Sequence, residues 1–151
     1  MILLFARHGK AEERKPGQSD EERRLTEEGR KGVEAVARLL PVTPSIIYVS
    51  PLRRAVETGE IFARILGVEM KIVDELRPEV CSFDSLRRYV ADRVMFVGHA
   101  PSIENVVSEL VGGRIKLKSG AVAIVELEKY ERGTGVLTAL ITPDVATRAG
   151  R

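Results

Sequence analysis

The chain has 151 residues, with 24 Lys and Arg against 22 Asp and Glu, so that its formal net charge is +2. This length suits one domain with a substantial core, and we expect a single domain over residues 1–151. The small net charge, without a dense basic block, argues against nucleic-acid binding, and the absence of a long apolar stretch argues against a membrane segment or signal peptide.

The first half of the chain is predicted to alternate strands and helices. Residues 2–6 form a short buried strand, and the charged loop at 10–24 is either a disordered spacer or a lip over a site. Thr26 caps a helix whose apolar residues recur at helical spacing until a proline ends it. A second strand covers 45–49, and Ser50 caps the next helix, with proline at its first position.

The second half continues this alternation. We expect a third strand at 69–73, a modest helix at 83–91, a fourth strand at 93–97 and a helix that starts at Pro101. A glycine-containing turn then joins two strands of an antiparallel hairpin, near 120–128 and 134–142. This order predicts an α/β fold with three layers (α/β/α), in which helices cover both faces of a mainly parallel sheet with an antiparallel edge.

The chain's two histidines each follow a predicted strand, where open α/β sheets bind their ligands. His8 is a candidate nucleophile because a neutral imidazole is available near pH 7. Arg7 is suited to binding phosphate oxygens, and Gly9 would let the backbone approach a ligand closely. His99 could donate a hydrogen bond to a phosphate oxygen. The alternative is that these are ordinary surface, capping or satisfied core histidines.

Arg54 lies in the first turn of the second predicted helix, roughly opposite the apolar stripe of that helix. Arg54 could contribute to an anion site at the amino end of this helix, or it could be an ordinary solvent-facing arginine. Two histidines without a partner cysteine or acid cluster make a poor zinc motif, so we expect no metal. Cys81 is the only cysteine, which excludes an internal disulfide and fits a reducing, cytoplasmic setting. A structural role for Cys81 is favoured over a reactive thiol.

Four motifs in this order resemble the histidine phosphatase superfamily, which includes the cofactor-dependent phosphoglycerate mutases. They are Arg7-His8-Gly9, Leu25-Thr26-x-x-Gly29, Ser50-Pro-Leu-x-Arg54-Ala55-x-x-Thr58 and Gly98-His99. The resemblance covers residues 1 to about 112 and implies a phosphoglycerate mutase-like fold. It also implies that His8 is the nucleophile, that phosphate is bound by Arg7, Gly9, Arg54 and His99, and that no cofactor is required.

Large members of this family carry a glutamate that protonates the leaving oxygen. In this chain the corresponding stretch reads Asp74-Glu-Leu76-Arg-Pro78-Glu79, with proline at the expected place. Glu79 is our candidate for the acid, with Glu75 and Asp84 as further possibilities, although each could equally be a solvated carboxylate. A site without an acid suits phosphoramidate bonds better than esters, because a protonated imidazole leaves readily.

The short chain and the missing acid resemble the SixA-type phosphohistidine phosphatases. We therefore expect a metal-independent phosphatase that dephosphorylates phosphohistidine on a partner protein. The alternatives are a broad-specificity phosphatase for small phosphate esters and a non-catalytic phosphate-binding module. Lys10 follows the glycine where many relatives have an acid or amide, and it either adds affinity for phosphate or an acidic partner or is solvated. The oligomeric state is left open.

Overall fold

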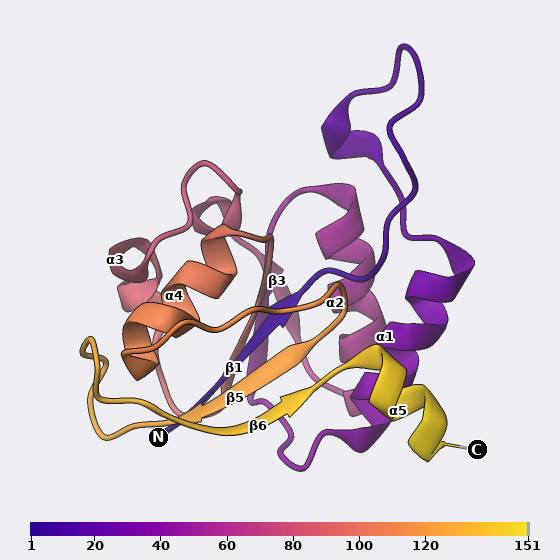
Figure 1. Ribbon diagram of the computed structural model, residues 1–151. Coiled ribbons are helices and arrows are strands. Elements are labelled where there is room, and N and C mark those ends of the chain that lie inside the picture. Colours follow the sequence, from indigo (N-terminus) through magenta and orange to yellow (C-terminus); the bar gives the residue numbers. More distant parts are fainter. Residues whose placement is uncertain (151) are drawn as a thin grey trace.

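The computed structural model describes residues 1–150, so Arg151, the last residue of the expected domain, lies outside it. A six-stranded sheet runs in the order β3-β2-β4-β1-β5-β6 (Figure 1). Its strands are β1 (Ile2–Arg7), β2 (Ile46–Val49), β3 (Met70–Ile72), β4 (Val94–Gly98), β5 (Val122–Glu126) and β6 (Val136–Ile141). Strands β3, β2, β4 and β1 are parallel, and β5 is antiparallel to both its neighbours, as predicted.

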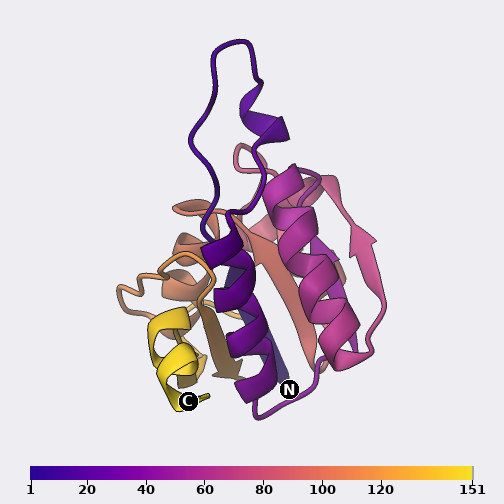
Figure 2. The same cartoon turned by 90° about the vertical axis from the view of Figure 1, so that its right-hand side faces the viewer.

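Helices cover both faces of this sheet. Figures 1 and 2 show α1, α2 and α5 on one face and α3 and α4 on the other. Their bounds are α1 (Glu27–Leu39), α2 (Arg53–Leu66), α3 (Phe83–Leu86), α4 (Ser102–Val111) and α5 (Pro143–Ala149). The arrangement confirms the predicted three layers.

The sheet separates two hydrophobic cores because successive side chains of a strand point to opposite faces. In β1, Leu3 and Phe5 pack with the residues of α3 and α4, whereas Leu4 and Ala6 pack with those of α1 and α2. All four are fully buried. Burial on both faces explains why β1 reads as a continuous apolar run rather than an alternating one.

The helices differ from the predictions in four places, one of which is the start of α4 at Ser102, with Pro101 as its N-cap rather than its first residue. The prediction that Ser50 caps the second helix is wrong, because α2 begins at Arg53 and the Ser50 side chain is bound elsewhere. The helix expected at 83–91 is a short α-helix followed by a 3₁₀ turn, which ends at Tyr89. No prediction was made for α5, which Thr142 caps by accepting a hydrogen bond from the Val145 N–H.

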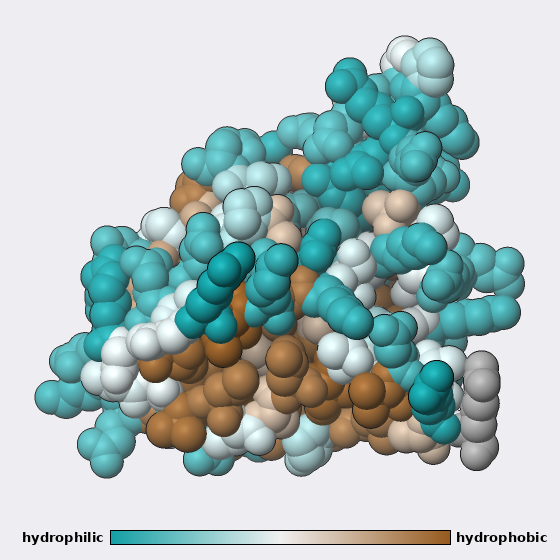
Figure 3. Space-filling model, in the orientation of Figure 1, coloured by the Kyte–Doolittle hydropathy of each residue, from teal (hydrophilic) through white to brown (hydrophobic). Residues whose placement is uncertain are grey.

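The outer surface divides into two regions (Figure 3). Hydrophilic residues cover the loop that follows β1, and hydrophobic residues gather over the lower front, where β5 and β6 lie. Val136 and Leu140 of the edge strand β6 contribute to the exposed apolar surface. Among residues 1–150, no helix is both long enough and apolar enough to cross a bilayer.

Strand register brings residues that are distant in sequence to one edge of the sheet. Arg7 pairs with Gly98 across β1 and β4, and the His8 N–H donates to the Gly98 carbonyl at 3.0 Å. On the other side of β4, the Ser50 N–H donates to the Val97 carbonyl at 3.1 Å. The carboxyl ends of β1, β4 and β2 therefore lie next to one another.

Candidate active site

A hollow of about 460 Å³ opens at this edge of the sheet. It brings together Arg7, His8, Arg54 and His99, which come from three separate segments, whereas Gly9 is not among the residues that line it. The lining residues are Arg7, His8, Lys10, Ala11, Asp20, Arg23, Arg54, Pro78, His99, Ala100 and Ser119. Larger hollows lie elsewhere on the surface, but neither histidine lines them.

His8 is held with one ring nitrogen toward its own backbone and the other toward Arg54. Its Nδ1 atom lies 2.7 Å from the Gly9 carbonyl, which can only accept, so Nδ1 carries the proton. The Arg54 Nε–H donates to His8 Nε2 at 3.3 Å. The Gly9 N–H in turn donates to the Thr58 hydroxyl at 3.0 Å, which anchors the loop to α2. His8 Nε2 therefore carries the lone pair of the ring, and this lone pair accepts the hydrogen bond from Arg54.

Both histidines have a pKa well below the usual value. Burial lowers the pKa of His8 to about 4. The hydrogen bond to the Gly9 carbonyl raises this pKa, whereas the positive charges of Arg54 and Arg7 lower it further. Burial, followed by the charges of His8 and Arg54, lowers the pKa of His99 to about 3. The two rings lie 5.2 Å apart between centroids. Both imidazoles are consequently neutral near pH 7.

Arg54 is buried, which excludes the solvent-facing alternative. Only 6% of its side chain is exposed, although it lies in the first turn of α2. Its Nη1 donates to the Asp20 carbonyl at 2.8 Å, and its Nη2 forms an ion pair with the Asp20 carboxylate at 3.1 Å. The guanidinium thus bridges the loop and the histidine.

Three buried side-chain nitrogens of the pocket lack a hydrogen-bond partner within residues 1–150, namely Arg7 Nε, Arg23 Nε and His99 Nδ1. Arg23 Nε still lies 2.9 Å from the Asp20 carboxylate, whereas Arg7 Nε and His99 Nδ1 have no protein partner. Arg7 Nη1 donates to the Leu117 carbonyl at 2.9 Å. A buried donor without an acceptor costs about 1–3 kcal/mol, so native structures keep few of them. An oxyanion in the pocket would provide acceptors for a guanidinium and an imidazole at once.

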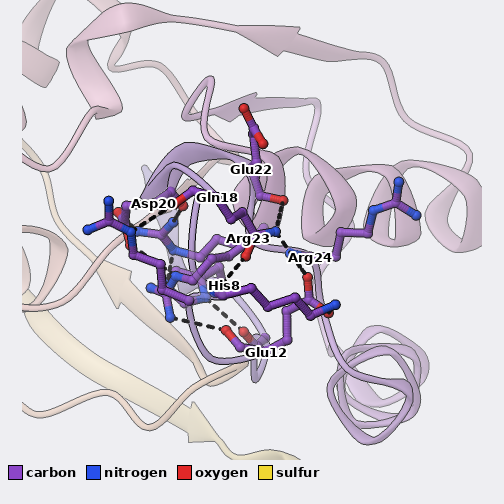
Figure 4. Close-up of polar contacts among 11 residues, drawn as sticks. His8, Glu12, Gln18, Asp20, Glu22, Arg23 and Arg24 are labelled. Carbon is purple, nitrogen blue, oxygen red and sulfur yellow. Dashed lines mark hydrogen bonds and ion pairs between the residues drawn. The ribbon is translucent and has the colours of Figure 1, made fainter.

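The 10–24 loop forms a lip over the pocket, which was one of the two alternatives predicted for it. A bridge between Ala11 and Leu25 closes its base, and a 3₁₀ turn at Asp20–Glu22 places Asp20 and the following Arg23 in the lining of the pocket. The Arg23 Nε lies 2.9 Å from the Asp20 carboxylate, and Figure 4 shows these two residues together with His8. Sequence reasoning missed both, since the only signal was that the loop is long and charged.

The proposed acids do not reach the pocket. Glu79 is exposed and does not line the hollow, where its neighbour Pro78 lies instead. The Glu75 carboxylate accepts a hydrogen bond from the Tyr89 hydroxyl at 2.8 Å, and Asp84 forms exposed ion pairs with Arg87 and Arg132. Among residues 1–150, the carboxylate that lines the pocket is that of Asp20.

The structure also places Lys10 and Cys81, two residues that the sequence left with alternative roles. Lys10 lines the rim of the pocket, and its exposed ammonium lies 2.8 Å from the Glu28 carboxylate. Burial raises the pKa of Cys81 to about 11, so its thiol stays protonated at neutral pH and is a poor nucleophile. No three His, Cys, Asp or Glu side chains of the described chain converge in a way that could hold a metal ion.

The lowered pKa values lead to a prediction about pH. Since the chain has two histidines, NMR titration of the ring signals should give two curves, both with midpoints below about pH 5. Unfolded histidines bind protons near pH 6.5 and the folded ones do not, so stability should fall as the pH drops from about 6.5 toward 4. A folded-state midpoint between pH 6 and 7 for either ring would contradict this geometry.

Comparison with known proteins agrees with the fold. A model of the histidine phosphatase superfamily (branch 1) matches residues 3–81. The structure of the protein histidine phosphatase SixA complexed with tungstate is similar, with 24% identity and a TM-score of 0.81 over 96% of this chain and 99% of that chain.

Two other solved structures share the fold. Phosphoserine phosphatase from Entamoeba histolytica in complex with 3-phosphoglyceric acid has 17% identity and a TM-score of 0.70, over 93% of this chain and 96% of that one. A mycobacterial glucosyl-3-phosphoglycerate phosphatase has 16% identity and a TM-score of 0.70, over 91% and 97%. A comparison with curated proteins gave no match. The predicted phosphoglycerate mutase-like fold is confirmed.

Proposed function

Because the chain belongs to the histidine phosphatase superfamily, we propose that it is a phosphatase that transfers a phosphoryl group to His8 and acts best on phosphohistidine carried by a protein. The observation that carries the proposal is the neutral His8, whose Nε2 lone pair accepts from the Arg54 guanidinium in a pocket where Arg7 Nε and His99 Nδ1 are buried without a protein partner. The proposal uses side chains alone and needs no cofactor.

In the first step the hydrogen bond from Arg54 Nε to His8 Nε2 opens, which frees the Nε2 lone pair. Nε2 then attacks phosphorus, and the bond from phosphorus to the leaving group breaks. Negative charge spread over the three phosphoryl oxygens is met by Arg7, Arg54 and His99, which supply donors fixed before the reaction begins. The Gly9 carbonyl holds the His8 ring in place, and its hydrogen bond to Nδ1–H strengthens as the ring gains positive charge. The Gly9 N–H is bound to Thr58, so the backbone is anchored at this point.

In the second step a water molecule attacks the phosphorus of phospho-His8. The nitrogen–phosphorus bond breaks, inorganic phosphate leaves, and Nε2 regains its lone pair. The same three residues bind the oxygens, because the charge distribution of the second transition state repeats that of the first. One pocket therefore serves both steps.

The proton requirement of the leaving group favours phosphohistidine as the substrate. Burial by itself would raise the pKa of Asp20, but the Arg54 and Arg23 guanidinium groups outweigh it and hold the pKa below its usual value. Asp20 is thus ionised at neutral pH and has no proton to give. A phosphohistidine ring protonated on its other nitrogen leaves as neutral imidazole without help, whereas an alkoxide needs an acid.

The form of the site also suits a protein substrate. The segment between α2 and β4 holds only β3, α3 and short 3₁₀ turns, so within residues 1–150 it supplies no long insertion that could form a further layer over the pocket. A histidine that projects from a protein surface can enter such a pocket directly. A small phosphate ester is the second candidate, because the hollow of about 460 Å³ has room beyond a single phosphoryl group.

Substrate comparison tests this proposal. We expect kcat/KM for a histidine-phosphorylated protein domain to exceed that for phosphoserine, sugar phosphates and phosphoglycerate by about tenfold or more, since 1.4 kcal/mol of transition-state stabilisation gives that factor. The matched control is the same protein domain phosphorylated on serine. A tenfold preference for the small esters would contradict the proposal, and phosphate binding without turnover of any substrate would favour a binding module.

A further inference from the structure

Ser50 is a buried polar residue that the proposed mechanism leaves without a role. It follows β2 directly, its exposed fraction is 0%, and its Oγ lies 2.7 Å from His99 Nε2. His99 itself is only 2% exposed. Which of the two groups donates in this hydrogen bond depends on which ring nitrogen carries hydrogen, so the hydroxyl and the ring must be considered together.

Counting donors and acceptors assigns that proton. The Ser50 Oγ accepts a hydrogen bond from the Leu52 N–H at 3.3 Å, which leaves the hydroxyl hydrogen in need of an acceptor. In the described chain the acceptor within reach is His99 Nε2. A neutral imidazole has one N–H and one lone pair, so if Nε2 accepts, the hydrogen is on Nδ1. The alternative, with hydrogen on Nε2, would leave the buried Ser50 hydroxyl hydrogen without an acceptor.

We propose that Ser50 is a positioning residue that selects the Nδ1–H tautomer of His99 and thereby makes this ring a donor to the phosphoryl oxygens. The inference rests on the proposed function, in which His99 contacts the phosphoryl group. His99 Nδ1 is the buried ring atom without a protein partner, so its hydrogen is free for a ligand oxygen. In the other tautomer Nδ1 would present a lone pair to an anion and repel it.

The low pKa of His99 explains why a tautomer matters here. With burial holding that pKa at about 3, the ring stays neutral and has a single N–H to offer. A histidinium would donate from both nitrogens and would need no selection. In a neutral ring, the neighbour of Nε2 decides whether the phosphoryl group meets a donor or an acceptor.

The test combines ¹⁵N NMR of the histidine rings with kinetics of Ser50→Ala and Ser50→Thr. In the wild type and in Ser50→Thr, which keeps the hydroxyl, His99 should be protonated on Nδ1. Ser50→Ala should give a mixture of tautomers and lower kcat about tenfold to hundredfold with a small change in KM, because a transition-state donor is lost. Ser45→Ala is the control, since its exposed hydroxyl lies at the opposite end of β2.

The outcomes separate this inference from the proposed function. A wild-type His99 protonated on Nε2 would overturn the role of Ser50 even if His8 becomes phosphorylated. A wild-type His99 protonated on Nδ1 in a protein that never forms phospho-His8 would instead overturn the proposed function. If Ser50→Ala does not fold, the tautomer of the wild type and of Ser50→Thr still decides the matter.

Discussion

Replacing His8 with Ala is expected to reduce turnover by about 10⁴-fold or more, because the nucleophile itself is removed. Phosphate binding should be largely kept, since Arg7, Arg54 and His99 remain to hold the oxygens. Hydrolysis of a histidine-phosphorylated protein measures the first effect, and calorimetry with inorganic phosphate measures the second. Brief exposure of the wild type to labelled substrate should also leave an acid-labile, base-stable label that His8→Ala lacks.

Cys81→Ser is the matched control for this labelling. It removes the chain's single cysteine, whose partly buried thiol stays protonated at neutral pH, and it should keep both label and activity. Hydrolysis by His8→Ala at the wild-type rate would show that the mechanism proposed above is wrong. A label that persists in His8→Ala and disappears in Cys81→Ser would assign the intermediate to the thiol.

The second large effect is expected at Arg54. Arg54→Ala should lower kcat/KM by about 10³-fold, because a buried guanidinium next to His8 Nε2 is lost from the transition state. Arg54→Lys should recover little of this loss. An ammonium is a compact point charge and does not reproduce the planar fork that contacts His8 and Asp20 together.

Arg53→Ala provides the control on the same turn of α2. Its guanidinium is 46% exposed and lies 3.8 Å from Glu57, outside the residues that line the pocket. Surface ion pairs of this kind contribute about 0–1 kcal/mol, so activity should be unchanged. Equal losses in Arg53→Ala and Arg54→Ala would mean that the start of α2 is being disrupted, and the role of Arg54 in phosphoryl transfer would be rejected.

The loop between β1 and α1 forms ion pairs with Arg54 and Arg77. Asp20 forms an ion pair with Arg54 and Arg23, and Glu21 forms one with Arg77 at 2.7 Å, so the lip is held by charges on two sides. A phosphoryl group that binds Arg54 competes with the Asp20 carboxylate for the same guanidinium. Because Asp20 is about half exposed, added salt should screen and weaken its ion pair with Arg54.

Local patterns in the sequence were sufficient for most of the fold. Buried strands such as β1 and β4 read as short apolar runs, and α1 shows helical spacing with Thr26 as its cap, whose side chain accepts from the Gly29 N–H. These features depend on neighbours within a few residues. The end of α2 could also be predicted from Gly67, because a glycine can adopt the left-handed conformation that ends a helix, and Gly67 does so.

The sequence by itself determined that two histidines and two arginines would follow the strands or start a helix at one edge of a parallel sheet. Only the tertiary structure decided which other side chains join them: Asp20 and Arg23 enter the pocket, Glu79 stays outside, and Ser50 binds His99 instead of capping α2. The reason is physical. Strand and helix periodicity are set by near neighbours, whereas contacts between loops depend on where the chain runs after the sheet and its helices have packed.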